Sequence, residues 1–218
     1  MEAENQTTLD SGNETLVLRV GYDGTSYAGF AQQEKQPHVK TVAGELRQAL
    51  RTVLRRDVEL TCAGRTDAGV HARAQYVSLP FGAEEFEQRT SQRLLRSLGA
   101  VLPPDIRVYE LYRAPSGFSA RFDARARRYR YHLCSGPVGP LFCANWSWWI
   151  RTAQPHALDA NAMNEAARCL IGEHDFKSFC KAQSAIDKPT CRYVMSAFFE
   201  PEVVLGEETL VFDIVGNA

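Results

Sequence analysis

The 218-residue sequence lacks the features that mark membrane and secreted proteins. No apolar run approaches the roughly 18 residues that a membrane-spanning helix needs. The N-terminal segment is polar and acidic, without a basic stretch followed by an apolar one, so no secretory signal is expected. No two cysteines have the C-x-x-C spacing of metal or redox sites. We therefore expect a cytoplasmic protein with reduced thiols at Cys62, Cys134, Cys143, Cys169, Cys180 and Cys191.

The sequence also has none of the short motifs that bind common cofactors or form hydrolase sites. Neither G-x-G-x-x-G nor G-x-x-x-x-G-K-[S/T] occurs, so a nucleotide cofactor is not expected. The nucleophile motif G-x-S-x-G is absent as well. The five histidines are scattered, without H-E-x-x-H or a Cys/His spacing, which argues against a zinc site. We expect neither a cofactor nor a metal.

The net charge of −1 is distributed unevenly along the chain. Residues 1–14 and residues 200–218 contain acidic charges and no Lys or Arg. The residues between them carry 17 of the 26 acids and all 25 bases, a net charge of +8. Twenty of those bases are arginines, whose planar guanidinium suits bidentate contacts to phosphate. An Arg-rich middle therefore indicates a polyanionic partner.

The first half of the chain follows the pattern of a split β-α-β unit. Residues at helical spacing predict a helix over 42–54, with Thr41 as its N-cap, and a weaker helix over 86–98 that Gly99 ends. Alternating or β-rich residues predict strands over 15–22, 57–63, 74–80 and 106–112. This order is that of a ferredoxin-like unit, an antiparallel sheet with both helices on one face. The opposite face of such a sheet often serves as a platform for RNA.

The second half begins in the same way but does not complete the pattern. Residues 158–170 have helical spacing that Gly172 ends, and strands are predicted over 124–134, 146–150, 191–199 and 209–215. A repeat of the first unit would need one more helix on this sheet. We therefore predict an α+β fold of two ferredoxin-like or RRM-like lobes with antiparallel sheets, the second lacking its last helix. The predicted parts are an acidic, flexible segment over 1–14, a first lobe over 15–113 and an incomplete second lobe over 114–218.

The stretch GRTDAGVH, from Gly64 to His71, is the strongest candidate for a catalytic loop. It lies between two predicted strands, where a rigid scaffold usually holds functional side chains. Arg65 and Asp67 are close enough in a bent loop to pair, which would keep Asp67 ionised. From spacing alone, a structural turn with a surface ion pair is an equally simple interpretation.

A second candidate is the Arg-rich and Tyr-rich stretch over 118–131. On a strand, Arg and Tyr side chains at alternate positions would share one face and could contact phosphates while stacking on bases. The alternative is a solvated edge strand whose charges prevent aggregation. The predicted RNA-binding residues are Arg73, Arg121, Arg125, Arg127, Arg128 and Arg130.

Together these motifs resemble those of the tRNA pseudouridine synthase A family. The resemblance covers roughly residues 16–218 in colinear order. It rests on YDGTSYAGF at 22–30, the helix that begins at Thr41-Val42, GRTDAGVHA at 64–72, FSARF at 118–122, RRYRY at 127–131, GEHDFKSF at 172–179 and FDIVGNA at 212–218.

The resemblance implies isomerisation of uridine to pseudouridine at positions 38 to 40, in the anticodon stem-loop of tRNA. It assigns the nucleophile to Asp67, the arginine that pairs with it to Arg65, and the ring that packs on the target base to Tyr129. It leaves open whether the carboxylate attacks C1′, attacks the base, or removes a C2′ proton on the way to a glycal. It implies no cofactor or metal, and a homodimer.

The sequence departs from the family pattern at its C-terminal end. Family members continue from Asn217-Ala218 into a helix with a Met-Val-Arg motif, whose Arg also lies at the active site. We therefore expect either a fragment of a longer protein or a naturally short form. The alternative function is a non-catalytic tRNA-binding protein or an inactive truncated relic of the same family.

Overall fold

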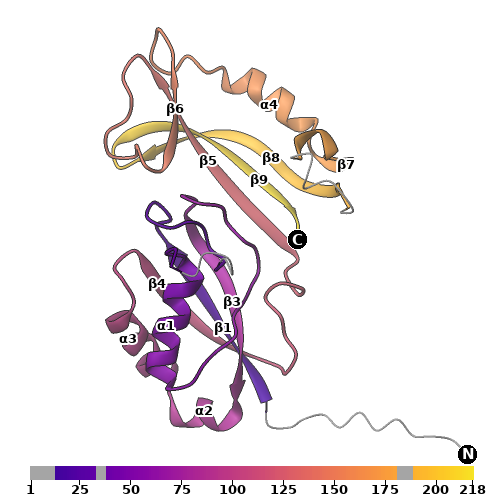
Figure 1. The fold of residues 1–218 in the computed structure, drawn as a ribbon. Coiled ribbons are helices and arrows are strands. Elements are labelled where there is room, and N and C mark those ends of the chain that lie inside the picture. Colours follow the sequence, from indigo (N-terminus) through magenta and orange to yellow (C-terminus); the bar gives the residue numbers. More distant parts are fainter. Residues whose placement is uncertain (1–12, 33–37, 181–188) are drawn as a thin grey trace, which may run out of the picture. The chain divides into compact units, whose positions relative to one another are not determined.

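The computed structural model describes residues 13–32, 38–180 and 189–218. The chain divides into two units, one that ends at Ala124 and one from Arg125 to Ala218, and each is described by itself (Figure 1). The sequence pattern places the boundary after residue 113. Most of the segment predicted to be flexible, 1–14, lies outside the described residues, and its last two residues belong to the first strand.

The first unit is a four-stranded antiparallel sheet with helices on one face (Figure 1). The strand order is β2-β3-β1-β4, which confirms the predicted ferredoxin-like arrangement. The elements are β1 (Asn13–Tyr22), α1 (Val42–Leu54), β2 (Thr61–Cys62), β3 (Ala72–Gly82), α2 (Ala83–Gln88), α3 (Ser91–Val101) and β4 (Ile106–Ala114).

Two elements of this unit differ from the prediction. The strand predicted over 57–63 is reduced to the two residues of β2. The helix predicted over 86–98 is split into α2 and α3, because Arg89 has an extended backbone and Thr90 Oγ1 accepts the N–H of Arg93 to begin a new helix. Gly99 lies inside α3 and does not end it, since an isolated glycine weakens a helix without breaking it.

The core of the first unit lies between the sheet and α1. Leu16, Leu18 and Val20 of β1 alternate toward the helices and are at most 1% exposed. They meet the fully buried Leu46 and Leu50 of α1. The helix begins where predicted, with Thr41 Oγ1 accepting the N–H of Gly44 at 3.2 Å. This packing fixes the start of α1 next to the loop that carries the candidate site.

The second unit is a five-stranded mixed sheet in the order β6-β5-β9-β8-β7. Its elements are β5 (Ala126–Gly136), β6 (Ser147–Arg151), α4 (Ala160–Arg168), β7 (Gly172–Asp175), a 3-10 turn (Lys177–Phe179), β8 (Cys191–Val204) and β9 (Glu207–Asn217). β5 and β6 run parallel, unlike the antiparallel pairing predicted, because residues 137–146 return the chain so that β6 starts beside His132. The other pairs of this sheet are antiparallel.

Helix α4 packs on β8 and covers part of one face of this sheet (Figure 1). Ala167 of the helix lies against Val194 and Ala197 of β8, and all three are at most 5% exposed. Asp159 caps the start of α4 by accepting two main-chain N–H groups. In the described residues of this unit α4 is the one α-helix, whereas the first unit has three, α1, α2 and α3.

Among the helices that the structure describes, none has the length and apolar character needed to cross a membrane, and the longest has 13 residues.

Candidate active site

The loop over residues 64–71 connects β2 to β3 and lies against the segment 22–30, which begins at the last residue of β1. The main-chain N–H of Phe30 donates to the carbonyl of Thr66 at 3.0 Å. The Tyr22 hydroxyl lies 2.9 Å from Thr66 Oγ1. Both the backbone and the side chain of Thr66, the residue before the candidate nucleophile, are thus held by the neighbouring segment.

Two glycines allow this close approach. Gly29 has a φ of +101°, and a Cβ on it would lie 2.7 Å from the carbonyl oxygen of Thr66. A Cβ on Gly24 would lie 2.0 Å from the carbonyl oxygen of Val70. A residue with a side chain fits neither position unless the loop moves. The glycines of the YDGTSYAGF motif therefore bring the segment 22–30 against the loop.

Side chains hold the two ends of the loop. At its start, the Gln75 side-chain amide forms two hydrogen bonds with the backbone of Gly64. Nε2 donates to the Gly64 carbonyl at 2.6 Å, and Oε1 accepts the Gly64 N–H at 3.3 Å. At its end, His71 Nδ1 accepts the N–H of Gly24 at 3.2 Å and lies 3.1 Å from Asp23 Oδ1. The path of the loop is therefore fixed at both ends as well as in its middle.

Two tyrosines beneath the loop remain protonated. Burial raises the pKa of the Tyr22 phenol, which keeps its hydroxyl neutral beside the loop. Burial and the neighbouring Asp105 carboxylate raise the pKa of Tyr27, whose hydroxyl donates to Asp105 Oδ1 at 2.6 Å. These groups act as hydrogen-bonding supports and not as bases.

The two charged side chains of the loop, Arg65 and Asp67, are both exposed. In the described part of the chain, neither forms an ion pair with a side chain of opposite charge. The main-chain carbonyl of Asp67 accepts the N–H of Val70 at 3.3 Å, which turns the backbone under the carboxylate. The site thus combines a fixed backbone with an exposed carboxylate and an exposed guanidinium. The predicted pairing of Arg65 with Asp67 in the loop is not formed here, and its role at the site stays a prediction.

Two of the predicted RNA-binding arginines belong to the same unit as Asp67. Arg73 is exposed on β3, two residues after the loop ends at His71. Arg121 is exposed in the segment that follows β4, and its guanidinium carbon lies 5.3 Å from the centre of the Phe122 ring.

Tyr129 lies on β5 of the second unit. It is in register with Ile214 of β9, which is in register with Ala197 beneath α4, so the Tyr129 ring is on the α4 face of the sheet. The Tyr129 side chain is 48% exposed, and Tyr131 on the same face is 61% exposed. Arg127 also alternates onto this face, and Arg125 precedes the strand.

Arg128 and Arg130 point to the opposite face, where they surround a buried carboxylate. Arg128 Nε donates to Asp213 at 2.9 Å, and Arg130 Nε lies 3.1 Å from the same carboxylate. Asp213 itself is fully buried. Arg130 also donates to Glu200 at 3.0 Å and pairs with Glu202. Sequence reasoning identified these arginines as RNA ligands and did not find Asp213, although the C-terminal FDIVGNA block contains it.

The thiols and possible metal ligands form no further site in the described chain. All six cysteines are free, and Cys134 and Cys143 are buried with their sulfur atoms 3.7 Å apart. Burial raises the pKa of the Cys143 thiol to about 11, so it remains protonated. Among the described residues, no three His, Cys, Asp or Glu side chains are grouped so that they could hold a metal ion.

A profile of the tRNA pseudouridine synthase family matches residues 19–123. Three curated proteins named tRNA pseudouridine synthase A are also similar to the chain. The one from Streptomyces avermitilis is 46% identical over 178 residues, which are 79% of this chain and 60% of that protein. The one from Caldicellulosiruptor bescii is 36% identical over 191 residues, which are 87% of this chain and 73% of that protein. The one from Halalkalibacterium halodurans is 35% identical over 207 residues, which are 93% of this chain and 71% of that protein. The chain therefore spans about 60% of the length of the Streptomyces relative.

Proposed function

The chain belongs to the tRNA pseudouridine synthase family, and from this premise we propose that the protein isomerises uridine to pseudouridine in tRNA. The observation that carries the proposal is the loop around Asp67, where an exposed carboxylate sits on a backbone held in place by the segment 22–30. The proposed targets are the uridines at positions 38 to 40, in the anticodon stem-loop.

The proposed reaction moves a bond within one nucleotide. The bond from N1 of uracil to C1′ of the ribose breaks, the base turns, and a bond from C5 to C1′ forms. A proton leaves C5, and N1 is protonated, so reactant and product have the same composition. The protein must therefore supply a carboxylate near the sugar and base, hold the detached base, and exclude side reactions.

We assign the carboxylate to Asp67 and its charge partner to Arg65. Both lie in the loop over 64–71, with one residue between them, so a bound nucleotide that displaces water would bring the two charges into a medium of lower polarity. An ion pair formed there keeps the Asp67 carboxylate ionised, as nucleophilic or basic catalysis requires.

We assign the packing of the target base to Tyr129. A uridine within a stem-loop must leave its stack before its C1′ can be reached, and an aromatic ring can replace the lost stacking. The half-exposed ring of Tyr129 on β5 offers such a surface.

The RNA backbone is proposed to contact the six arginines identified above. Arg73, Arg121, Arg125 and Arg127 would contact phosphates directly. Arg128 and Arg130 use part of their hydrogen-bonding capacity on Asp213, and would contact RNA only through the N–H groups that remain. A cytoplasmic location and a homodimer complete the proposal, since tRNA is a large cytoplasmic substrate.

The function is tested by mapping pseudouridine in an unmodified tRNA transcript after incubation with the full-length natural protein. We expect modification within positions 38 to 40 and none with the Asp67→Ala variant, because that variant lacks the carboxylate. Modification at other positions would overturn the proposed targets. Equal modification by Asp67→Ala would overturn the proposed site, and tRNA binding without modification by the natural protein would favour the non-catalytic alternative.

A further inference from the structure

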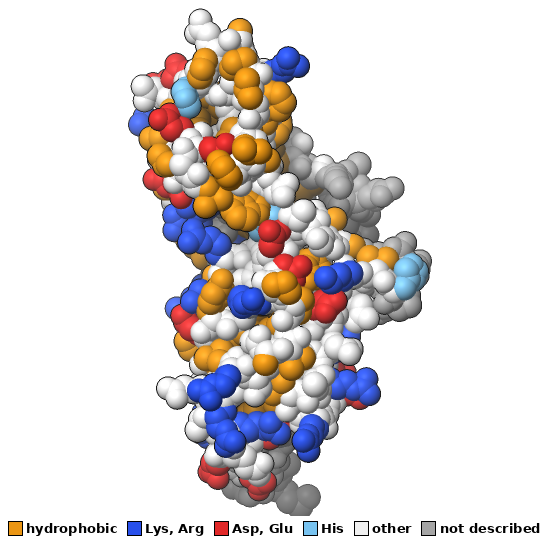
Figure 2. Space-filling model, turned by 90° about the vertical axis from the view of Figure 1, so that its left-hand side faces the viewer, with side chains coloured by type: hydrophobic (Ala, Val, Ile, Leu, Met, Phe, Trp, Pro, Cys, Tyr) orange, Lys and Arg blue, Asp and Glu red, His pale blue; other side chains and the backbone are white. Residues whose placement is uncertain are grey.

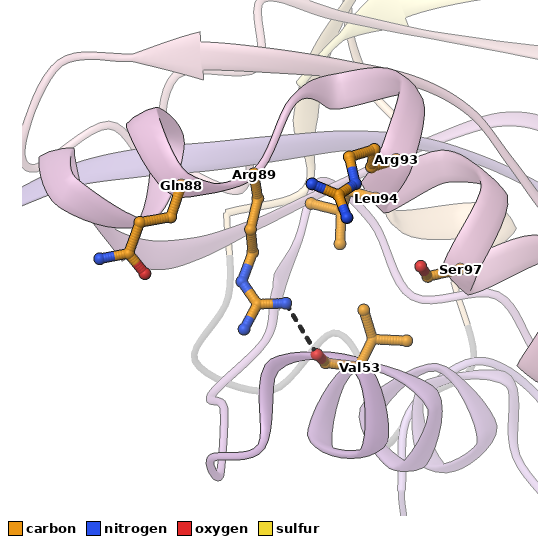
Figure 3. A pocket seen from close by; sticks show the side chains of 6 residues that line it. All are labelled: Val53, Gln88, Arg89, Arg93, Leu94 and Ser97. Atoms are coloured by element: carbon orange, nitrogen blue, oxygen red, sulfur yellow. Dashed lines mark hydrogen bonds between the residues drawn. The ribbon is translucent and has the colours of Figure 1, made fainter.

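A cavity of about 250 Å³ lies at the far end of α1, where the helix meets α2 and α3 (Figure 3). It is lined by Val53, Gln88, Arg89, Arg93, Leu94 and Ser97. Its volume is below the roughly 300–1,000 Å³ of pockets that enclose whole small molecules. The cavity therefore suits a chemical group of a larger ligand.

The lining combines an apolar base with two guanidinium groups. Val53 and Leu94 supply the apolar part. Arg89 Nη1 donates to the carbonyl of Val53 at 3.0 Å, which holds its guanidinium at the edge of the cavity and leaves other N–H groups available. Figure 3 shows the guanidiniums of Arg89 and Arg93 extending toward the same space between α1 and α3. Gln88 and Ser97 add an amide and a hydroxyl.

The positive charge at this cavity is partly offset by Glu85, whose carboxylate interacts electrostatically with Arg89. No acidic side chain is among the residues that line it. Glu85 of the adjacent α2 is bound by Arg56, with two hydrogen bonds of 2.9 Å. The Arg93 guanidinium has no acidic partner among the described residues. The positive end of the α3 dipole lies at the same place, because that helix begins at Ser91.

The surface around the cavity carries charges of both signs, since Glu84 and Glu87 of α2 are exposed close to Gln88 and Arg89. Figure 2 shows Lys and Arg side chains gathered on the lower part of the first unit, on the side where Figure 1 places α3. Two guanidiniums that converge beside a helix N-terminus make a site for an anion with several oxygen acceptors, and phosphate fits this description best.

We propose that this cavity binds a phosphate group of the RNA backbone and forms a second contact with the substrate, away from the reacting nucleotide. The assignment to RNA rests on the proposed function. α1 begins at Val42, whose N–H donates to the carbonyl of Gly29 beside the Asp67 loop, and its 13 residues end next to the cavity. At about 1.5 Å per residue the two places are about 20 Å apart, a span that a stem-loop covers.

Such a contact positions the substrate without reading its sequence, since phosphates are the same at every nucleotide. Arg93 and Arg89 would hold the stem while the loop of the RNA reaches Asp67. Because a protein side chain that neutralises a phosphate releases a counterion from the RNA, this contact should make the affinity for tRNA fall more steeply with salt concentration.

The test compares Arg93→Gln with Arg96→Gln in the full-length protein. Arg96 is exposed on the same helix but does not line the cavity, so it is a matched control for loss of one positive charge. We expect Arg93→Gln to weaken binding of an unmodified tRNA transcript roughly fivefold at moderate salt. The slope of log affinity against log salt should become shallower by about 0.9. Arg96→Gln should leave both near their natural values, and thermal unfolding should be unchanged in both variants.

Equal tRNA binding and equal salt slopes for the two variants would overturn the proposal.

Titration with uridine 5′-monophosphate and with inorganic phosphate separates RNA from a free phosphorylated ligand. Saturable binding of either probe that Arg93→Gln abolishes, with tRNA affinity unaffected, would overturn the RNA assignment. A selective loss of tRNA affinity in Arg93→Gln supports the cavity even if the protein fails to form pseudouridine. Pseudouridine formation with no difference between the variants refutes the cavity and leaves the proposed function standing.

Discussion

Gly24, Gly29 and Thr66 hold the backbone that carries Asp67. Gly29 and Gly24 let the segment 22–30 approach the loop at distances that no side chain would permit. Thr66, immediately before Asp67, is bonded through its backbone and through its hydroxyl. A carboxylate on such a backbone loses little further entropy when the substrate binds, and this is how a site gains from preorganisation.

We predict that Gly29→Ala disrupts the loop and reduces turnover. The new Cβ would meet the carbonyl oxygen of Thr66 at 2.7 Å, and the residue would also have to keep a φ of +101°. Stability should fall by about 2 to 3 kcal/mol. Turnover of tRNA should fall on the order of tenfold or more, because the Asp67 backbone moves.

The control is Gly117→Ala, at a glycine that also has a positive φ but has open space around its Cβ position. That variant should lose about 1 kcal/mol from backbone strain alone. Urea unfolding and tritium release from 5-³H-uridine tRNA measure the two effects. Equal losses of turnover in the two variants would show that the close approach of Gly29 to the loop is unimportant.

At the scale of elements, β9 holds β5 through side-chain ion pairs as well as through main-chain hydrogen bonds. The buried Asp213 carboxylate of β9 binds Arg128 and Arg130, the residues on either side of Tyr129. Because alternate residues of a strand face opposite ways, holding these two arginines on one face keeps the Tyr129 ring on the other. The ion pairs are therefore supports for the residue proposed to pack on the target base.

We predict that Asp213→Asn destabilises the second unit by about 2 to 3 kcal/mol, because it leaves two guanidiniums around a buried neutral group. Glu200→Gln is the matched control, since Arg130 retains Glu202 and Asp213. The control should cost less than about 1 kcal/mol. Denaturant unfolding of both variants provides the measurement, and equal midpoints would mean that the Asp213 network does not stabilise β5.

The start of β9 holds the connection between β5 and β6. The Glu207 carboxylate accepts main-chain N–H groups from Leu141, Phe142 and Cys143 at 2.6, 3.0 and 2.8 Å. These hydrogen bonds lower the pKa of Glu207 below its ordinary value near 4.5, and those from Leu141 and Cys143 have the largest effect. A lowered pKa means that folding favours the ionised carboxylate.

The prediction for Glu207→Gln is a loss of stability that depends on pH. The stabilisation by the ionised group is present above the unfolded-state pKa, and it is lost as pH falls through the lower folded-state pKa. The variant should therefore be less stable than the natural protein at pH 7, and the difference should shrink below about pH 4.5. Glu208→Gln, whose carboxylate contacts the exposed His156, is the control. A difference that stayed constant from pH 7 to pH 3 would contradict the role of the charge.

At the scale of the whole molecule, the sequence predicted the class of fold and the order of most of its elements, but it did not predict the strand β7. Buried residues at regular spacing, such as Leu46 and Leu50 in α1, carry that information locally. Local patterns did not predict that the helical region over 86–98 divides at Thr90, or that β6 lies parallel to β5. The parallel pairing depends on tertiary contacts, which periodicity within one segment does not encode. The division at Thr90 comes from a local N-cap, which the spacing of apolar residues alone does not reveal.

The part of the candidate site that is contiguous in the sequence was predictable, and the part that joins distant residues was not. The GRTDAGVH stretch is contiguous, so its composition was sufficient to single out Asp67 and Arg65. The supporting contacts join residues far apart in the chain, such as Tyr22 to Thr66 and Arg128 to Asp213. Arg128 and Arg130 were interpreted as RNA ligands because their charge is visible in the sequence while their partner Asp213 is 83 or more positions away.

The most direct test of the central claim is tritium release from 5-³H-uridine tRNA by the full-length protein and by its Asp67→Asn variant. The substitution keeps the shape of the side chain and removes its charge. If the Asp67 carboxylate carries the reaction, the natural protein releases tritium as C5 forms its bond to C1′, while the variant releases none and still binds tRNA. Release by Asp67→Asn at the natural rate would contradict the assignment of the active site.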